Sequence, residues 1–321
     1  MMEGKLLPYT IVTRASQLAK RQTALFVEAF AECFPGDMLL VQPVQTRGDH
    51  TTGPIYNLKK AFVGELERAL LDGSAQVAVH SLKDMSVYYQ EGLRIAAVLP
   101  RARAEDVMVS HSYTRISDLP SGAKVGTCSA RRAAQIRQIN PSIRIALCRG
   151  NVHTRLEKLK QGQYDALVLA GAGLDRLSIR HCPDLNIVAL SLDDFVPAGG
   201  QGAIAVQARS DQSDLLLKLA RVNHLPTYRA VMLERDIIKR FGGNCSTPLG
   251  VYVQPKDHGF SVSVFLGDVF GHQAIKKTDF WPYQSEGYSG KVNDLVDSIC
   301  REGGQEVLDG YQKDLGKFFD D

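Results

Sequence analysis

Residues 124–149 read KVGTCSARRAAQIRQINPSIRIALCR, and three segments follow one another in this stretch. The apolar run KVGTC precedes RRAAQIRQI, which has helical spacing of its apolar residues, and IRIALCR is a second apolar run. A strand, a helix and a strand in this order form the unit of parallel sheets, because the helix carries the chain back to the edge where it started. The stretch therefore predicts an α/β layered fold.

The same alternation continues on both sides of this stretch. Further strands are expected at 9–14, 38–44, 75–81, 93–99 and 165–171, and further helices at 16–30, 64–71 and 153–161. The glycines of VPAGGQGA (196–203) suit a hinge or a tight crossing. After them come helical stretches at 214–220 and 228–241, the run SVSVFLG and a polar tail, so a separate domain is expected from about residue 222.

Composition restricts the possible partners. The chain has 321 residues, of which 44% are hydrophobic, enough to bury the cores of two or three domains. Its 38 basic residues barely outnumber its 35 acidic ones and form no block, so neither nucleic acid nor an anionic membrane is expected as a partner. The amino terminus lacks the apolar core of a signal peptide, and no apolar run is long enough to span a bilayer, which predicts a cytoplasmic protein.

The cysteines show neither a C-x-x-C motif nor the Cys/His spacing of a zinc site. No disulfide framework and no metal site are therefore expected, and the thiols should be free. They are Cys33, Cys128, Cys148, Cys182, Cys245 and Cys300.

Polar and charged residues gather where the expected strands end, which is the side of an open α/β sheet that binds ligands. These residues are Arg14, Ser16, Ser81, Lys83, Asp84, Thr127, Ser129, Arg131, Arg132, Arg149, Arg155 and Arg176. Five arginines come from the middle third of the chain. Guanidinium groups bind carboxylates in pairs of hydrogen bonds, so the pattern predicts a small ligand with several carboxylates or phosphates.

Each of these residues also has an ordinary explanation. A single arginine after a strand is commonly a solvated charge or an ion-pair partner. Asp84 could cap a helix, or it could carry a proton because Lys83 and nearby arginines tune its pKa. His80 is expected to pack or to form a hydrogen bond locally. GAGLDR (171–176) lacks the third glycine of a dinucleotide fingerprint and no phosphate loop occurs, so nucleotide chemistry is not expected.

Six motifs occur in an order and spacing that resemble one enzyme family. They are VHSLKD (79–84), GTCSARR (126–132), RGNVHTRL (149–156), LAGAGLDRL (169–177), PAGGQGA (197–203) and GGNCSTPLG (242–250). Together they resemble the porphobilinogen deaminase (hydroxymethylbilane synthase) family over residues 10–255. The tail beyond residue 255 carries no comparable signal.

The resemblance implies a three-domain α/β protein. Two α/β lobes similar to periplasmic binding proteins would be hinged across a cleft, with a small α+β domain at the C-terminus. The first lobe, 1–100 plus 198–221, would carry the proton-transfer acid, and the second, 101–197, the carboxylate-binding arginines. The third, 222–321, would carry the cofactor cysteine.

The resemblance also implies the chemistry. Cys245 would form a thioether to a dipyrromethane cofactor and would remain a permanent anchor, needing no neighbouring base. Four porphobilinogen molecules would be joined head to tail with loss of ammonia, and water would release hydroxymethylbilane. Asp84 would be the catalytic acid, exchanging protons with the departing amine and the ring and stabilising cationic species.

Binding roles follow by the same resemblance. The cofactor-binding residues would be Cys245, Lys83, Ser81, Thr127, Ser129, Arg131, Arg132, Arg155 and Asp84. The substrate-binding residues would be Arg14, Ser16, Arg149, Arg155, Arg176 and Gln201. A monomer without a metal ion is expected.

Several positions depart from the family pattern. Cys128 replaces a serine near the arginines, where its thiol could fill space or compete as a nucleophile. The other departures are Gly64, Gln76, Ala130, Gln207 and Asn244. They bear on rate and fidelity more than on the type of reaction.

Two other functions share part of this pattern. A two-lobed protein that binds small polycarboxylate anions without catalysis would use the same strand-end arginines but would need neither Asp84 nor Cys245. A thiol-dependent transferase would need a base beside Cys245, and the sequence places no histidine near it.

Overall fold

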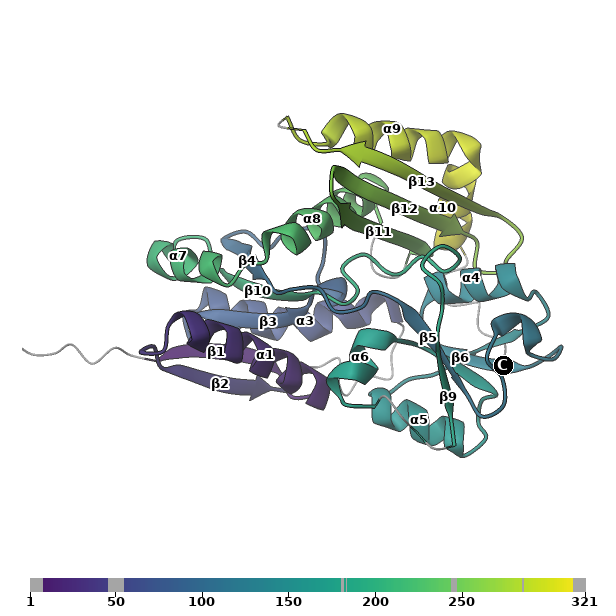
Figure 1. Ribbon diagram of the computed structural model, residues 1–321, viewed down its shortest axis with the longest axis horizontal. Helices are drawn as coiled ribbons and strands as arrows, with labels where there is room; N and C mark the ends of the chain where they lie inside the picture. Colours follow the sequence, from purple (N-terminus) through teal and green to yellow (C-terminus); the bar gives the residue numbers. More distant parts are fainter. Residues whose placement is uncertain are drawn as a thin grey trace, which may run out of the picture. The chain divides into compact units, whose positions relative to one another are not determined.

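The computed structural model describes residues 8–45, 55–179, 182, 184–243, 247–284 and 286–313. The chain divides into two compact units (Figure 1). The first unit comprises Met1–Ala102 and Ala203–Arg229, and the second comprises Arg103–Gly202 and Ala230–Asp321. The three-domain boundaries near 100, 197 and 221 stay a prediction.

The first unit is built on a five-stranded sheet of order β2-β1-β3-β10-β4. Its elements are β1 (Tyr9–Arg14), α1 (Gln17–Cys33), β2 (Leu39–Val44), α3 (Ile55–Leu71), β3 (Val77–Ser81), the 3₁₀ turn η1 (Leu82–Asp84), β4 (Leu93–Val98), β10 (Ile204–Arg209), α7 (Ser213–Arg221) and the start of α8 (Leu225–Arg240). Strand β1 runs parallel to β2 and to β3, whereas β10 is antiparallel to both β3 and β4. Four of the five strands therefore point the same way.

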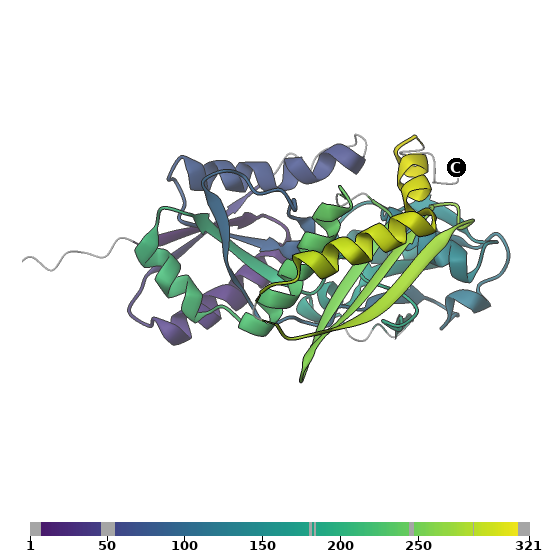
Figure 2. The same cartoon turned by 90° about the horizontal axis from the view of Figure 1, so that it is seen from above.

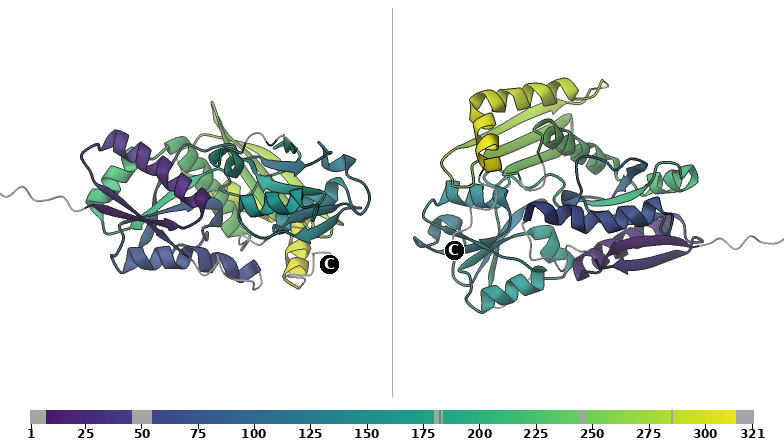
Figure 3. Two further views of the ribbon diagram at one scale, coloured as in Figure 1. Left: turned by 90° about the horizontal axis from the view of Figure 1, so that it is seen from below. Right: turned by 180° about the vertical axis from the view of Figure 1, so that it is seen from behind.

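Apolar residues alternate along β1 and so supply a core on each face of this sheet. Ile11 packs with Phe26 and Phe30 of α1, whereas the next residue, Val12, packs with Leu66 and Leu70 of α3. Helices α1 and α3 accordingly cover opposite faces (Figure 3, left). This two-sided burial fixes the strand register and hence the position of the residues that follow each strand.

The second unit contains another five-stranded sheet, of order β7-β6-β8-β5-β9. Its elements are β5 (Asp106–Ser110), the 3₁₀ turn η2 (Ile116–Asp118), β6 (Lys124–Thr127), α4 (Ala130–Ile139), β7 (Arg144–Leu147), α5 (Val152–Lys160), β8 (Ala166–Ala170), α6 (Gly171–Arg176) and β9 (Asn186–Ala189). Strand β6 is parallel to β7 and β8, and β5 is antiparallel to β8 and β9. Burial again alternates, since Val168 faces the α4 side and Leu167 the α5 side.

The rest of the second unit is a three-stranded antiparallel sheet of order β11-β12-β13 with helices on one face. It comprises most of α8, then β11 (Leu249–Lys256), β12 (Gly259–Gly267), β13 (Ala274–Pro282), α9 (Ser289–Ile299), the π-helical segment η3 (Cys300–Gly304) and α10 (Gln305–Lys313). Ile237 of α8, Val262 of β12, Trp281 of β13 and Val296 of α9 share one buried core. Figure 2 shows α9 running along this sheet.

The opposite face of the three-stranded sheet contacts the five-stranded part of the second unit. Phe265 of β12 packs with Ala134 of α4 and with Val196. Arg137 of α4 donates from Nη1 to the carbonyl oxygen of Val269 at 2.6 Å. The two sheets of this unit are thus joined by buried contacts through α4.

The expected α/β class, with two lobes and a smaller C-terminal α+β part, is confirmed. Expected strands such as 75–81 and 93–99 correspond to β3 and β4 with shifts of at most two residues. Strands β5, β9, β10, β11 and β13 and helices α6, α9 and α10 were not expected, and β5 supplies a buried acid to the site described next.

Candidate active site

The first unit gathers five predicted site residues at one edge of its sheet, because the parallel strands β1 and β3 end there. Arg14 is the last residue of β1, and Asp84 closes the turn η1 that directly follows β3. Ser16 caps α1, accepting a hydrogen bond on Oγ from the Ala19 backbone N–H at 3.2 Å. Lys83 and Asp84 are both partly exposed, as suits residues that meet a ligand.

Ser81 is held by a glutamine that the sequence did not single out. Its hydroxyl accepts from Nε2 of Gln22 at 2.8 Å and lies 3.0 Å from Oε1 of the same side chain. Gln22 belongs to α1 and is only 3% exposed. The sequence did contain a signal for Gln22, because a glutamine on the apolar face of a helix becomes buried. A buried amide requires a hydrogen-bond partner.

His80 lies one residue before Ser81 and is buried in the sheet, opposite Ala205 of β10. Burial lowers the pKa of His80 to about 4, Gln207 and Asp84 oppose this shift, and Arg14 adds to it. Its Nε2 atom has no hydrogen-bond partner among the described residues. The expected packing role is incomplete, because this neutral imidazole is electrostatically linked to both Asp84 and Arg14.

The second unit gathers its predicted residues at the carboxyl edge of β6, β7 and β8, which are parallel. Thr127 ends β6 and is fully buried, and its Oγ1 accepts from the Ser129 backbone N–H at 3.1 Å. Ser129 caps α4 by accepting from the Arg132 backbone N–H at 3.4 Å. The amino terminus of α4 therefore lies at this edge, where its partial positive charge favours anions.

Arg131 and Arg132 both point into the protein and share one buried carboxylate, Asp106, at the start of β5. Nη1 of Arg131 lies 2.7 Å from Oδ2 of Asp106, and Nη2 of Arg132 lies 2.6 Å from Oδ1. Burial lowers the pKa of Arg131, and the Asp106 carboxylate opposes this shift. Gln201 joins the cluster, donating from Nε2 to the Ala104 carbonyl at 2.7 Å and to Asp106 Oδ1 at 3.1 Å.

The remaining arginines are less deeply placed. Arg155 is half-buried in α5 and donates from Nε to the Gly150 carbonyl at 2.8 Å. Arg149 follows β7, and its carbonyl accepts from Lys158 at 3.2 Å. Arg176 ends α6 and donates from Nη2 to the Gly202 carbonyl at 2.7 Å; burial lowers its pKa to about 10, opposed by Asp175.

Cys128 and Cys148 lie beside each other at the ends of β6 and β7. The Cys128 thiol donates to the Cys148 carbonyl oxygen at 2.7 Å. Burial raises the pKa of the Cys148 thiol, and Arg155 opposes this shift. Whether the Cys128 thiol fills space or competes as a nucleophile stays a prediction.

Three departures from the family pattern have visible surroundings. Gln76 accepts from the Thr10 backbone N–H at 2.9 Å, so its amide oxygen makes the bond a carboxylate would make. Gln207 donates to Oε1 of Glu67 at 3.1 Å. Gly64 has no atom within 4 Å of the position a Cβ would occupy.

Cys245 and Asn244 lie outside the described residues, as does most of the loop 48–58. Within the described part of the chain, no helix has the length and apolar composition to cross a membrane. No group of three or more His, Cys, Asp or Glu side chains there is placed to hold a metal ion.

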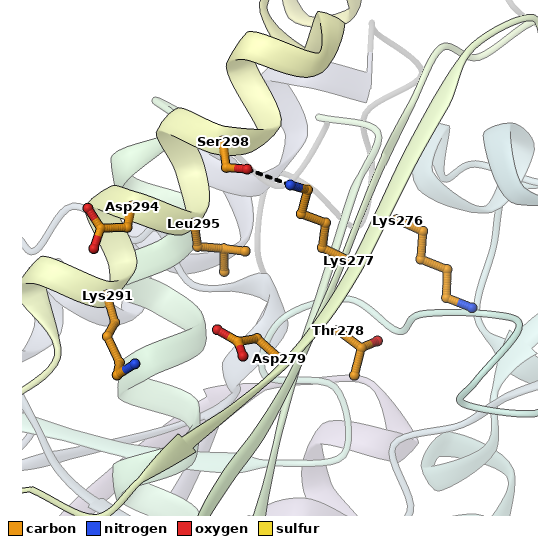
Figure 4. A pocket seen from close by; sticks show the side chains of 8 residues that line it. All are labelled: Lys276, Lys277, Thr278, Asp279, Lys291, Asp294, Leu295 and Ser298. Atoms are coloured by element: carbon orange, nitrogen blue, oxygen red, sulfur yellow. Dashed lines mark hydrogen bonds between the residues drawn. The ribbon is translucent and has the colours of Figure 1, made fainter.

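A surface pocket of about 530 Å³ lies between β13 and α9, far along the chain from the predicted site residues (Figure 4). Its lining includes Lys276, Lys277, Asp279, Lys291 and Asp294. Lys277 is already bonded to Ser298 and Glu302. None of the residues predicted to bind cofactor or substrate lines this pocket.

Comparison with known proteins gives matches to a single enzyme family along nearly the whole chain. A family model described as "Porphobilinogen deaminase, dipyromethane cofactor binding domain" matches residues 9–216. The porphobilinogen deaminase of Dichelobacter nodosus is 34% identical over 306 residues, covering 94% of this chain and 98% of the relative. That of Campylobacter concisus is 36% identical over 304 residues, covering 93% and 96%.

The comparison also matched a solved structure. It is an arginine 3rd transport system periplasmic binding protein from Legionella pneumophila, 14% identical, with a TM-score of 0.40 over 67% of this chain and 92% of that one. The family model matches more than half of the chain, and each of the two relatives aligns over at least 93% of it. This chain belongs to the porphobilinogen deaminase family.

Proposed function

We propose that the chain is a transferase that joins four porphobilinogen molecules head to tail, with loss of ammonia, and releases hydroxymethylbilane for tetrapyrrole synthesis. The observation that carries this proposal is the match of residues 9–216 to the cofactor-binding domain of the family, together with relatives that align over almost the whole chain. Family membership favours an enzyme over a polycarboxylate-binding protein without catalysis.

The dipyrromethane cofactor fits the side chains that are present. It carries several carboxylates, and the second unit offers buried guanidinium groups, among them an Nε of Arg131 and an Nε of Arg176 without a hydrogen-bond partner in the described residues. We propose that Thr127, Ser129, Arg131, Arg132 and Arg155 hold it from the second unit. Ser81, Lys83 and Asp84 would do so from the first. When bound through Cys245, the cofactor supplies the free pyrrole carbon that starts the chain.

Each condensation breaks the carbon–nitrogen bond of the substrate's aminomethyl group and forms a carbon–carbon bond to a pyrrole. Ammonia leaves after the amine has accepted a proton, and the attacked pyrrole carbon loses one. Asp84 is proposed to exchange these protons, because a partly exposed carboxylate can serve as both acid and base. Its negative charge would also stabilise the cationic carbon that forms as the amine departs.

Arg14, Ser16, Arg149, Arg155, Arg176 and Gln201 are proposed to bind the substrate. Bidentate guanidinium–carboxylate bonds would orient the acetate and propionate groups of porphobilinogen. The Arg155 and Arg176 side chains each have one donor fixed on a backbone carbonyl, which holds the rest of the guanidinium in a defined direction. We further propose that the enzyme acts as a cytoplasmic monomer with the three-domain division given above.

Two measurements test the function. Purified protein mixed with porphobilinogen should release ammonia and yield a product that absorbs as a porphyrin after oxidation in acid. Loss of substrate without a coloured product, or binding without consumption, would contradict the proposal.

The intact mass of the chain tests the anchor separately. Protein from a haem-making host should be heavier than the bare chain by one dipyrromethane, and Cys245→Ser should have the bare mass. Cys300→Ser is the matched control, since Cys300 is the other cysteine in the last hundred residues and lies against the C-terminal core. It should carry the added mass.

A further inference from the structure

One carboxylate in the second unit holds two guanidinium groups. Asp106 is 0% exposed, and Arg131 and Arg132, its ion-pair partners, are 3% and 7% exposed. By the family resemblance both arginines have the same expected role, and Asp106 lies outside the six motifs. The structure gives the two arginines different surroundings.

Arg132 is engaged by the protein through all three of its nitrogens. Its Nε and Nη2 both donate to Asp106 Oδ1, at 3.0 Å and 2.6 Å, and its Nη1 donates to the Val168 carbonyl at 2.9 Å. With Gln201 on the same oxygen at 3.1 Å, one side of the Asp106 carboxylate is fixed by two neighbouring side chains. The carboxylate therefore has little freedom to rotate.

Arg131 is engaged through Nη1, which lies 2.7 Å from Asp106 Oδ2 and donates to the Val196 carbonyl at 2.8 Å. The ring of Phe195 lies 5.7 Å from its Cζ and limits the tilt of the guanidinium plane. Its Nε is buried and has no hydrogen-bond partner among the described residues. One edge of Arg131 is thus fixed while the edge that carries Nε keeps a donor for another group.

The net charge of this cluster also favours a bound anion. Two guanidinium groups and one carboxylate leave one positive charge in a buried place, which is unfavourable unless an anion joins them. The amino terminus of α4, where both arginines stand, adds partial positive charge. A single ligand carboxylate would balance the cluster and take the open donor.

We propose that Asp106 is a positioning residue that turns the Nε edge of Arg131 toward one carboxylate of the cofactor. Arg132 and Gln201 hold Asp106 in place, in addition to the ligand contacts proposed for them above. This inference rests on the proposed function, because the ligand is the dipyrromethane of this family. It goes beyond that function by separating the roles of the two adjacent arginines and adding an acid that touches no ligand.

The test compares Asp106→Asn with Glu234→Gln. The asparagine keeps the size of the side chain but turns an N–H donor toward a guanidinium donor, which releases one arginine. Glu234 is an equally buried carboxylate of the same unit, whose oxygens accept from the Gly200 and Val253 backbone N–H groups at 2.6 Å and 2.8 Å. Its amide variant should lose stability without disturbing Arg131.

The readout is the fraction of folded chains that carry the cofactor, measured by intact mass after a protease has removed unfolded chains. We expect Asp106→Asn to lower the ratio of loaded to bare chains about tenfold, as an unsatisfied buried donor costs enough to do. Glu234→Gln should stay within about twofold of the wild type, because it leaves the charges around Arg131 unchanged.

Loading of folded Asp106→Asn at the wild-type level would overturn the inference. If that variant does not fold, Asp106→Glu decides, since it keeps the charge and moves the carboxylate by one methylene. Reduced loading of the folded glutamate variant supports the positioning role, and wild-type loading overturns it. A wild-type chain that carries no dipyrromethane would instead refute the proposed function itself.

Discussion

The two five-stranded sheets have the same strand order but carry opposite chemistry at their carboxyl edges. In each, the order is second, first and third parallel strand, then one antiparallel strand, then an edge strand. The first sheet presents Asp84 close to a buried neutral His80, whereas the second presents several arginines above a buried Asp106. Under the proposed function, the same scaffold would serve for proton transfer in one unit and for anion binding in the other.

The largest expected effect tests the acid of the first unit. Asp84→Ala should lower turnover by about 10²–10⁴-fold, because the proton-transfer group is lost. Its thermal stability should change little, since Asp84 is partly exposed. Asp72→Ala is the control, an exposed aspartate of the same unit that caps the Ser74 backbone N–H. Near-normal turnover of Asp84→Ala would remove the contrast between the two edges.

In the second unit, a buried ion pair of Asp106 should contribute more to the free energy of unfolding than an exposed ion pair does. Arg132→Met should lower the free energy of unfolding by about 3 kcal/mol, because Asp106 loses one of its two buried ion-pair partners. Arg240→Met breaks the exposed ion pair with Asp297 in the same unit and should cost less than about 1 kcal/mol. Urea unfolding of both variants gives the comparison, and equal losses would mean that burial does not matter here.

The stability of the first unit should depend on pH through His80. The folded-state pKa is about 4, below the ordinary value of 6.5, so between these values the unfolded chain binds a proton that the folded chain does not. Stability should thus fall as pH drops from 6.5 toward 4, by up to roughly 3 kcal/mol from this group.

Replacing the histidine isolates that contribution. His80→Gln should reduce the slope of unfolding free energy against pH in this window by up to one proton. Above pH 7 the difference between variant and wild type should stay constant, because the imidazole is neutral in both states. An unchanged slope below pH 6.5 would mean that the pKa of His80 is not lowered in the folded chain. The surroundings of His80, which include Asp84, Arg14 and Gln207, would then differ from those in the structure.

The arginine edge of the second unit can be probed along a single strand. Arg149→Leu should lower kcat/KM for porphobilinogen by about 10–100-fold, because a bidentate carboxylate contact is lost. Arg144→Leu alters an exposed arginine at the opposite end of β7 and should have little effect. If both variants were equally impaired, the carboxyl end of the strand would have no special role.

The smallest effect concerns the scaffold. Gly64 lies inside α3 with open space around its Cβ position, so Gly64→Ala should raise stability by up to about 1 kcal/mol. Gly162 has equally open space but a φ of +71°, and Gly162→Ala should destabilise the second unit. Thermal unfolding of the two variants distinguishes helix propensity from backbone strain. A stabilising Gly162→Ala would contradict this explanation.

Much of the fold was predictable because apolar periodicity is a local property. The runs at 9–14 and 166–170 are strands as expected, since each buries residues on both faces of a sheet. Strand β5 was missed because DVMVS is short and begins with an acid, and its partners β8 and β9 lie 56 or more residues away in register. Periodicity cannot report such pairings.

The sequence predicted the members of the candidate site, but not the partners that these residues have within the protein. Motifs identified Asp84 and the arginines, because strand ends can be located from sequence. They did not show that Arg131 and Arg132 turn inward onto Asp106, or that Gln22 holds Ser81. These pairs are far apart along the chain, with 25 positions between Asp106 and Arg131 and 59 between Gln22 and Ser81. They lie in separate elements that only folding brings together.

The sequence by itself determined the α/β class, the family and the set of polar residues at the strand ends, because these depend on local pattern and on motifs. Only the tertiary structure decided how those residues are used. The charge state and the partners of a buried carboxylate or imidazole depend on the elements packed around it. The surroundings of Asp106, on β5 beside α4, and of His80, opposite β10, therefore exist only in the folded chain.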